Sequence, residues 1–181
     1  MKLRLYQVDA FAARPFEGNP AAVVPLEEWL PDGLMQSIAL ENNLSETAFF
    51  VPEGDGYAIR WFTPAAEVVL CGHATLASAW VLFERLGCKE KRVSFSSRSG
   101  ELIVGRKGDL LVLDFPAQPA RPIPIPVGLV EALGARPSEC LVNIDLMAVF
   151  DDPEAMLRSD DLHRRILDVA GAVVDHLVAL G

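Results

Sequence analysis

The stretches RWFTPAAE (60–67) and LCGHATLASAWVLFERL (70–86) decide the fold. The first predicts a strand that runs into a loop. The second predicts a sharp turn at Gly72 and then a helix over 74–86, which ends at Gly87 because glycine commonly terminates helices.

This helix is apolar on nearly every face and carries charge only in its last turn, at Glu84 and Arg85. A helix of that composition that is too short to span a bilayer is surrounded by protein. We therefore expect it to be the central helix of a domain whose sheet wraps around it. Its large side chains should be almost inaccessible to solvent, namely Leu76, Trp80 and Phe83.

The start of the helix is a candidate binding site. The first backbone N–H groups of a helix lack internal partners and carry partial positive charge. Gly72 allows a ligand to approach the backbone closely, so an anionic group such as a carboxylate could dock at Gly72 and His73. The same field favours a neutral imidazole at His73. The alternative is that Gly72 only makes the turn and His73 only satisfies a helix cap.

A carboxylate in an apolar strand is the second candidate. Residues 44–51 (LSETAFFV) predict a strand in which Glu46, Ala48 and Phe50 share one face. A carboxyl buried in such surroundings becomes a usable acid or base near neutral pH. The alternative is a glutamate at a strand end that is paired or solvated.

Composition excludes several classes of function. The chain has 181 residues, 51% of them hydrophobic and 23% charged, so we expect a packed core. The net charge is −9 and the only basic cluster is Lys89-Glu90-Lys91-Arg92, which argues against nucleic acid and anionic membranes as partners. A small anionic substrate would need a local positive site.

Cysteine usage argues against a disulfide framework and against a bound metal. Cys71, Cys88 and Cys140 are odd in number and widely spaced, and the paired Cys/His spacing of a zinc site is absent. The N-terminus alternates polar and apolar residues, unlike a signal peptide, and no transmembrane run occurs. We therefore expect a cytoplasmic protein.

The remaining periodicity predicts an α+β fold with a mostly antiparallel sheet rolled around the central helix. We expect a first domain over 1–116, a proline-rich linker over 117–126 and the incomplete start of a second domain over 127–181. The predicted strands of the first domain are 3–11, 21–24, 44–51, 57–62, 93–97, 101–104 and 110–115, with a short helix at 34–41; beyond the linker we expect a helix at 127–133, a strand at 140–150 and a helix at 153–169.

Several motifs in the same order resemble the phenazine-biosynthesis isomerase (PhzF-like) family. They are VDAF (8–11), GNPAAV (18–23), NLSETAF (43–49), RWFTP (60–64) with Glu67, and CGHATLA (71–77). The resemblance implies a diaminopimelate-epimerase-like fold, in which two similar halves enclose the active site. It also implies cofactor-free proton transfer on a small carboxylate-bearing substrate. Glu46 is similar to the family's acid/base carboxyl, Gly72 and His73 match its helix-terminus residues, and Asn19 lies in its Gly-Asn-Pro motif near the site.

The sequence also departs from that family. The Glu-Asp-Pro and Thr-Gly-Ser-Ala motifs of the family's second half are not found, and Asp151-Asp152-Pro153 is only a superficial echo. We therefore expect a single copy of the chain to be inactive and to associate as a homodimer. Two other hypotheses stay open at this stage. One is a thiol-dependent racemase or epimerase with Cys71 as the base, and the other is a non-catalytic, dimerising remnant.

Overall fold

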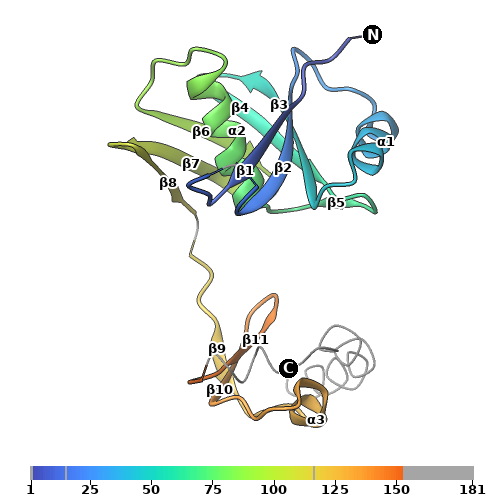
Figure 1. Ribbon diagram of the computed structural model, residues 1–181, viewed down its shortest axis with the longest axis vertical. Coiled ribbons are helices and arrows are strands. Elements are labelled where there is room, and N and C mark those ends of the chain that lie inside the picture. Colours follow the sequence, from blue (N-terminus) through green and yellow to red (C-terminus); the bar gives the residue numbers. More distant parts are fainter. Residues whose placement is uncertain (1, 15, 116, 153–181) are drawn as a thin grey trace. The chain divides into compact units, whose positions relative to one another are not determined.

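The structure, a computed structural model, describes residues 2–14, 16–115 and 117–152. The chain divides into two compact units, Met1–Pro116 and Ala117–Gly181. The first unit contains both of the candidate segments identified above, and the second contains a small sheet and a short helix (Figure 1).

The first unit alternates strands with two helices. In chain order its elements are β1 (Tyr6–Ala10), β2 (Asn19–Pro25), α1 (Asp32–Asn42), β3 (Glu46–Glu53), β4 (Gly56–Phe62), β5 (Glu67–Val68), α2 (Gly72–Glu84), β6 (Arg92–Ser97), β7 (Gly100–Lys107) and β8 (Leu110–Asp114). No helix among the described residues is both long and apolar enough to cross a membrane.

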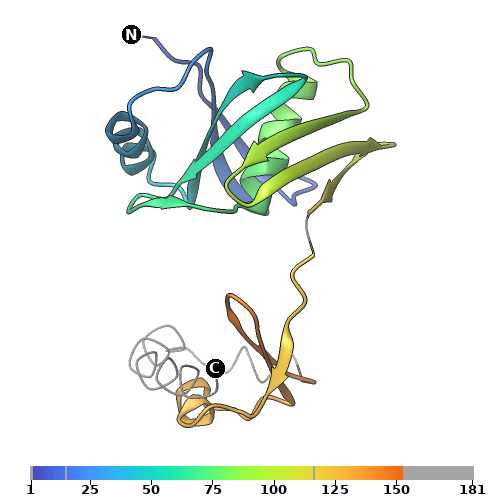
Figure 2. The same ribbon diagram turned by 180° about the vertical axis from the view of Figure 1, so that it is seen from behind.

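The strands form one sheet in the order β1-β2-β3-β4-β6-β7-β8, with β5 paired to β4. The β2–β3 and β4–β6 pairs are parallel, and the other pairs are antiparallel. A parallel pair needs a long crossover connection, and here the two crossovers contain α1 and α2. Figures 1 and 2 show the sheet curving around α2. The predicted mostly antiparallel sheet around a central helix is therefore confirmed.

Strand β3 is buried on both faces, which explains its unbroken apolar run. Ala48 and Phe50 lie in the cluster that surrounds α2, whereas Phe49 and Val51 lie in a second cluster with Met35 of α1. The predicted alternation of this strand is thus correct. It also places Glu46 on the α2 side of the sheet, because side chains two residues apart share a face.

The helix α2 begins earlier than predicted, at Gly72, and is not buried on every side. Phe83 is only 5% exposed, as expected, but Leu76 and Trp80 are half-buried. These two residues are four apart and line a groove together with residues 7–14 and 109–111, beside the edge strands β1 and β8. The expectation that Leu76 and Trp80 would be inaccessible is therefore wrong, since the sheet does not close over this stripe of the helix.

The second unit contains β9 (Arg121–Ile123), α3 (Leu129–Leu133), β10 (Glu139–Val142) and β11 (Leu146–Val149). Strands β11, β10 and β9 form an antiparallel sheet. Two expectations are corrected here. The segment expected to be a linker contains a strand, and Pro122 is tolerated there because β9 is an edge strand. The predicted single strand over 140–150 is a hairpin that turns between β10 and β11. The helix predicted at 153–169 lies outside the described residues.

Candidate active site at the start of helix α2

An ion-pair network fixes the segment that leads into α2. The guanidinium of Arg60 donates to both carboxylate oxygens of Glu67, at 2.7 and 2.8 Å, and to Oδ1 of Asp32 at 2.8 Å. These hydrogen bonds hold the pKa of Glu67 below its usual value, so the pair stays ionised. Because Arg60 is on β4 and Glu67 is on β5, the pair fixes the loop between them, just before Cys71.

The chain enters the helix through Cys71, which is the N-cap residue. Its backbone is extended, with φ −147° and ψ 111°. The Thr75 hydroxyl donates to the Cys71 carbonyl at 2.5 Å, which anchors the first turn. Gly72 follows as the first helical residue, and a Cβ at this position would lie 3.4 Å from the ring of Phe115. One side of the Gly72 backbone is therefore covered by Phe115.

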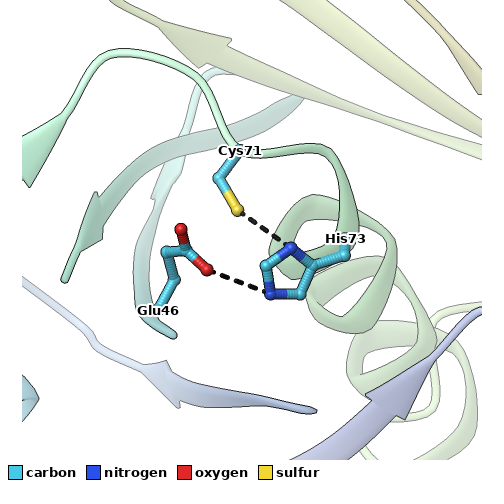
Figure 3. Close-up of side chains that lie close together, drawn as sticks. All are labelled: Glu46, Cys71 and His73. Atoms are coloured by element: carbon cyan, nitrogen blue, oxygen red, sulfur yellow. Dashed lines mark hydrogen bonds and ion pairs between the residues drawn. The ribbon is translucent and has the colours of Figure 1, made fainter. Parts of the chain in front are cut away.

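Glu46 and His73 meet at this helix terminus (Figure 3). Oε2 of Glu46, the first residue of β3, lies 3.2 Å from Nε2 of His73. The His73 side chain is 9% exposed and the Glu46 side chain is 20% exposed. Both facing atoms are buried, and neither has a well-aligned hydrogen bond within the described residues. This pair therefore has hydrogen-bonding capacity left for a ligand.

Cys71 approaches the other side of the same imidazole. Its Sγ lies 3.4 Å from Nδ1 of His73. Burial raises the pKa of the Cys71 thiol to about 12, and the negative charge of Glu46 acts in the same direction. The backbone N–H groups of Ala74 and His73 lower it, but by less. The thiol is therefore protonated at neutral pH, which disfavours its use as a base.

The imidazole of His73 is held neutral mainly by burial, which lowers its pKa. The Glu46 carboxylate and the backbone carbonyl of Pro20 raise the pKa, by less than burial lowers it. The sequence also favoured a neutral His73, but from the field of the helix terminus. Desolvation is the larger cause in the structure.

Glu46, Cys71 and His73 could also approach a metal ion. Their ligand atoms all lie within 4.8 Å of one another, which is the only such grouping among the described residues. However, Cys71 faces Nδ1 and Glu46 faces Nε2, and an ion binds only one of these nitrogens. Thiol and carboxylate therefore face different nitrogens of the ring and also lie close to each other.

Asn19 bonds the residue before Glu46 and follows a glycine that the backbone requires. Gly18 has φ +78°, and a Cβ there would lie 2.1 Å from the Ala10 carbonyl oxygen, so only glycine fits. The Ser45 hydroxyl, one residue before Glu46, donates to Oδ1 of Asn19 at 3.0 Å. The amide nitrogen of Asn19 keeps its donor capacity within the described part of the chain.

The structure thus brings Glu46 and His73 into contact, with Gly72 adjacent in the chain and Asn19 linked through Ser45. Sequence reasoning did not predict that Cys71 would contact His73 as part of this group. A usable signal was present, because an N-cap side chain faces the residues that follow it.

Comparison with known proteins identifies the family. The family described as "Phenazine biosynthesis-like protein" matches residues 8–123. Among similar proteins is an uncharacterized isomerase of Pseudomonas aeruginosa that is 54% identical over 86% of this chain and 60% of its own length. The human phenazine biosynthesis-like domain-containing protein is 49% identical over 67% of this chain and 45% of its own length.

Solved structures agree with this result. A PhzF-family protein of Enterococcus faecalis has a TM-score of 0.80 and 50% identity, covering 87% of this chain and 61% of that protein. A predicted epimerase of Pseudomonas aeruginosa has a TM-score of 0.66 and 23% identity, over 93% of this chain and 67% of that protein, and shows the shared fold. The chain spans about three fifths of the Pseudomonas isomerase it matches. It belongs to the phenazine biosynthesis-like (PhzF) protein family and has that family's diaminopimelate-epimerase-like α+β fold.

Proposed function

We propose that this protein is an isomerase that moves a proton within a small carboxylate-bearing metabolite, without a cofactor, and that Glu46 carries the proton. The observation that supports this most directly is the buried contact between Glu46 Oε2 and His73 Nε2, 3.2 Å apart at the start of α2. A partly buried carboxylate beside a neutral imidazole suits acid/base work near neutral pH.

In this mechanism the Glu46 carboxylate takes a proton from a substrate carbon whose C–H bond is acidified by conjugation. The electron pair of that bond delocalises toward the substrate carboxylate or an adjacent carbonyl. The protonated Glu46 then returns the proton to a different carbon, where a new C–H bond forms. Hydrogen-bond donors around the site stabilise the charge that builds up between these two steps.

Those donors would come from the N-terminus of α2, at Gly72 and His73, and from the amide nitrogen of Asn19. Their local field would offset the net charge of −9, which otherwise disfavours an anionic substrate. A cytoplasmic location and the absence of nucleic-acid or membrane partners remain expectations from composition.

The thiol-dependent alternative is less well supported. A thiol base must be ionised or easily ionised, but burial holds the pKa of Cys71 at about 12. The racemase and epimerase structures that resemble this chain at 12% identity share its fold and carry no argument about its base.

Proton transfer is tested by exchange with solvent. The protein is incubated in D2O with a panel of small conjugated carboxylates, and deuterium incorporation is followed by NMR. Glu46→Gln keeps the shape and removes the base, so incorporation should fall by about 10²–10⁴-fold. Glu41→Gln, an exposed glutamate on α1, is the matched control and should behave as the unsubstituted chain. Equal incorporation by the Glu46→Gln variant, or none by the unsubstituted chain in its dimeric form, would contradict the proposal.

We also propose that the chain forms a homodimer. Large apolar side chains are exposed in the first unit, for example Phe11 at 68% and Leu110 at 69%, and exposed apolar surface favours association. Sedimentation velocity at micromolar concentration tests this, and a stable monomer would refute it.

A further inference from the structure

The imidazole of His73 has a thiol beside one ring nitrogen and a carboxylate beside the other. Nδ1 faces Sγ of Cys71 at 3.4 Å, and Nε2 faces Oε2 of Glu46 at 3.2 Å. Figure 3 shows the three side chains grouped together, with one dashed line from Cys71 and one from Glu46 to the ring of His73. Each ring nitrogen therefore has its own neighbour, and the neighbours decide which nitrogen carries the proton.

We propose that Cys71 is a positioning residue that fixes the tautomer of His73: its S–H donates to Nδ1, so that Nε2 carries the ring proton and directs it at Glu46.

Two independent features support this direction. On the Cys71 side, burial keeps the sulfur protonated, so the thiol can donate, although it is a weak donor; Nδ1 of His73 and the Glu46 carboxylate are its two acceptors. On the Glu46 side, the carboxylate that faces Nε2 is an acceptor only. In a neutral imidazole one nitrogen donates and the other accepts. When the S–H of Cys71 is directed at Nδ1, the tautomer with Nδ1 as acceptor and Nε2 as donor satisfies both neighbours of the ring.

The consequence for the reaction rests on the proposed function, because it assigns the acid/base role to Glu46. A fixed Nε2–H directed at the Glu46 carboxylate holds it in one orientation for accepting the substrate proton. In the opposite tautomer, the lone pair of Nε2 would face the carboxylate oxygen and repel it. Cys71 thus acts on Glu46 through His73 and never touches the substrate.

The tautomer is measured directly by 15N NMR, since the shifts of Nδ1 and Nε2 distinguish a protonated from an unprotonated ring nitrogen. The chain has three histidines, and the His73→Gln variant identifies the His73 signals by their loss. Cys71→Ala removes the donor, whereas Cys71→Ser keeps one. Because Glu46 itself also favours Nε2–H, each Cys71 variant is also measured in the Glu46→Gln background, where that bias is reduced.

We expect Nε2–H in the unsubstituted chain and in Cys71→Ser. Losing one hydrogen bond should shift the tautomer ratio by about fivefold toward Nδ1–H in Cys71→Ala, most visibly in the Glu46→Gln/Cys71→Ala double variant. An Nδ1–H tautomer or a doubly protonated ring in the unsubstituted chain would overturn the proposal. This measurement does not depend on whether any variant folds. An unchanged ratio in both Cys71→Ala proteins would also overturn it.

The exchange assay adds a functional readout. Cys71→Ala should slow deuterium incorporation and Cys71→Ser should restore it. If Cys71 only filled space, the two variants should incorporate deuterium at equal rates. The two proposals fail separately. If Glu46→Gln leaves exchange intact, the acid/base role of Glu46 is wrong, but the NMR result still decides the tautomer.

Discussion

The reactivity of Cys71 toward an alkylating agent tests the electrostatics of the whole site. The thiolate is the reactive form of cysteine, and burial raises the pKa of Cys71 from 9.0 to about 12. At about pH 8, a shift of that size lowers the thiolate fraction about 1,000-fold. Steric protection slows the reaction further, because the residue is only 6% exposed. Iodoacetamide should therefore modify Cys71 in the folded chain at least about 1,000 times more slowly than in the unfolded chain.

The assay follows the peptide that contains Cys71 by mass spectrometry as a function of time. Its reference is the same peptide in protein unfolded by guanidinium, so that the sequence context is identical. Cys88 is half-buried and serves as an internal control for reagent access in the folded state. If Cys71 reacts as fast as it does in the unfolded chain, the sulfur is ionised beside a protonated His73. That result would refute the protonated thiol, and with it the tautomer proposal, and would restore the thiol-dependent epimerase hypothesis.

Three further predictions concern stability. Phe95→Ala should lower the free energy of unfolding by about 3–5 kcal/mol in chemical denaturation, because Phe95 is completely buried among Phe50 and Tyr57 beside α2; a loss below about 1 kcal/mol would refute that packing. Gly18→Ala should cost at least about 1–2 kcal/mol, since the position has φ +78° and no room for a Cβ, whereas Gly33→Ala, with open space, should cost little. The lowered pKa of His73 means that the unfolded chain binds a proton more readily than the folded one. Stability should therefore fall as pH drops below about 6.5, and His73→Gln should flatten this dependence; an equally steep profile in that variant would contradict the assignment.

Much of the first unit could be predicted because burial leaves a periodic signal. The alternation in β3 placed Glu46 on the face of Ala48 and Phe50, and the all-round apolarity of 72–83 identified the central helix. The same reasoning failed for Trp80. Apolarity shows what a helix is able to bury, but it does not show whether the strands on either side meet to cover it.

Other features depend on pairing that no local pattern records. The strand β9 was missed because proline-rich composition favours an unpaired extended segment, yet an edge strand needs hydrogen bonds on one side only. The contact between Glu46 and His73 forms because α2 packs on the face of the sheet that contains β3. The spacing of the two motifs in the sequence does not predict this contact. The sequence predicted a neutral His73, but burial, the main cause of its lowered pKa, became apparent only in the structure.

The parallel pairing of β4 with β6 has a consequence for how the chain reaches its native state. The hairpin of β3 and β4 is local and can form early, but β4 meets β6 only after the chain closes a loop that encloses all of α2. Glu46 is on the early hairpin, and His73 is on the enclosed helix, 27 residues later in the chain. We therefore expect their contact to form in the late phase of refolding. The ring signals of His73 would then report on completion of the first unit, and a refolding intermediate with an intact hairpin would still lack the acid/base pair.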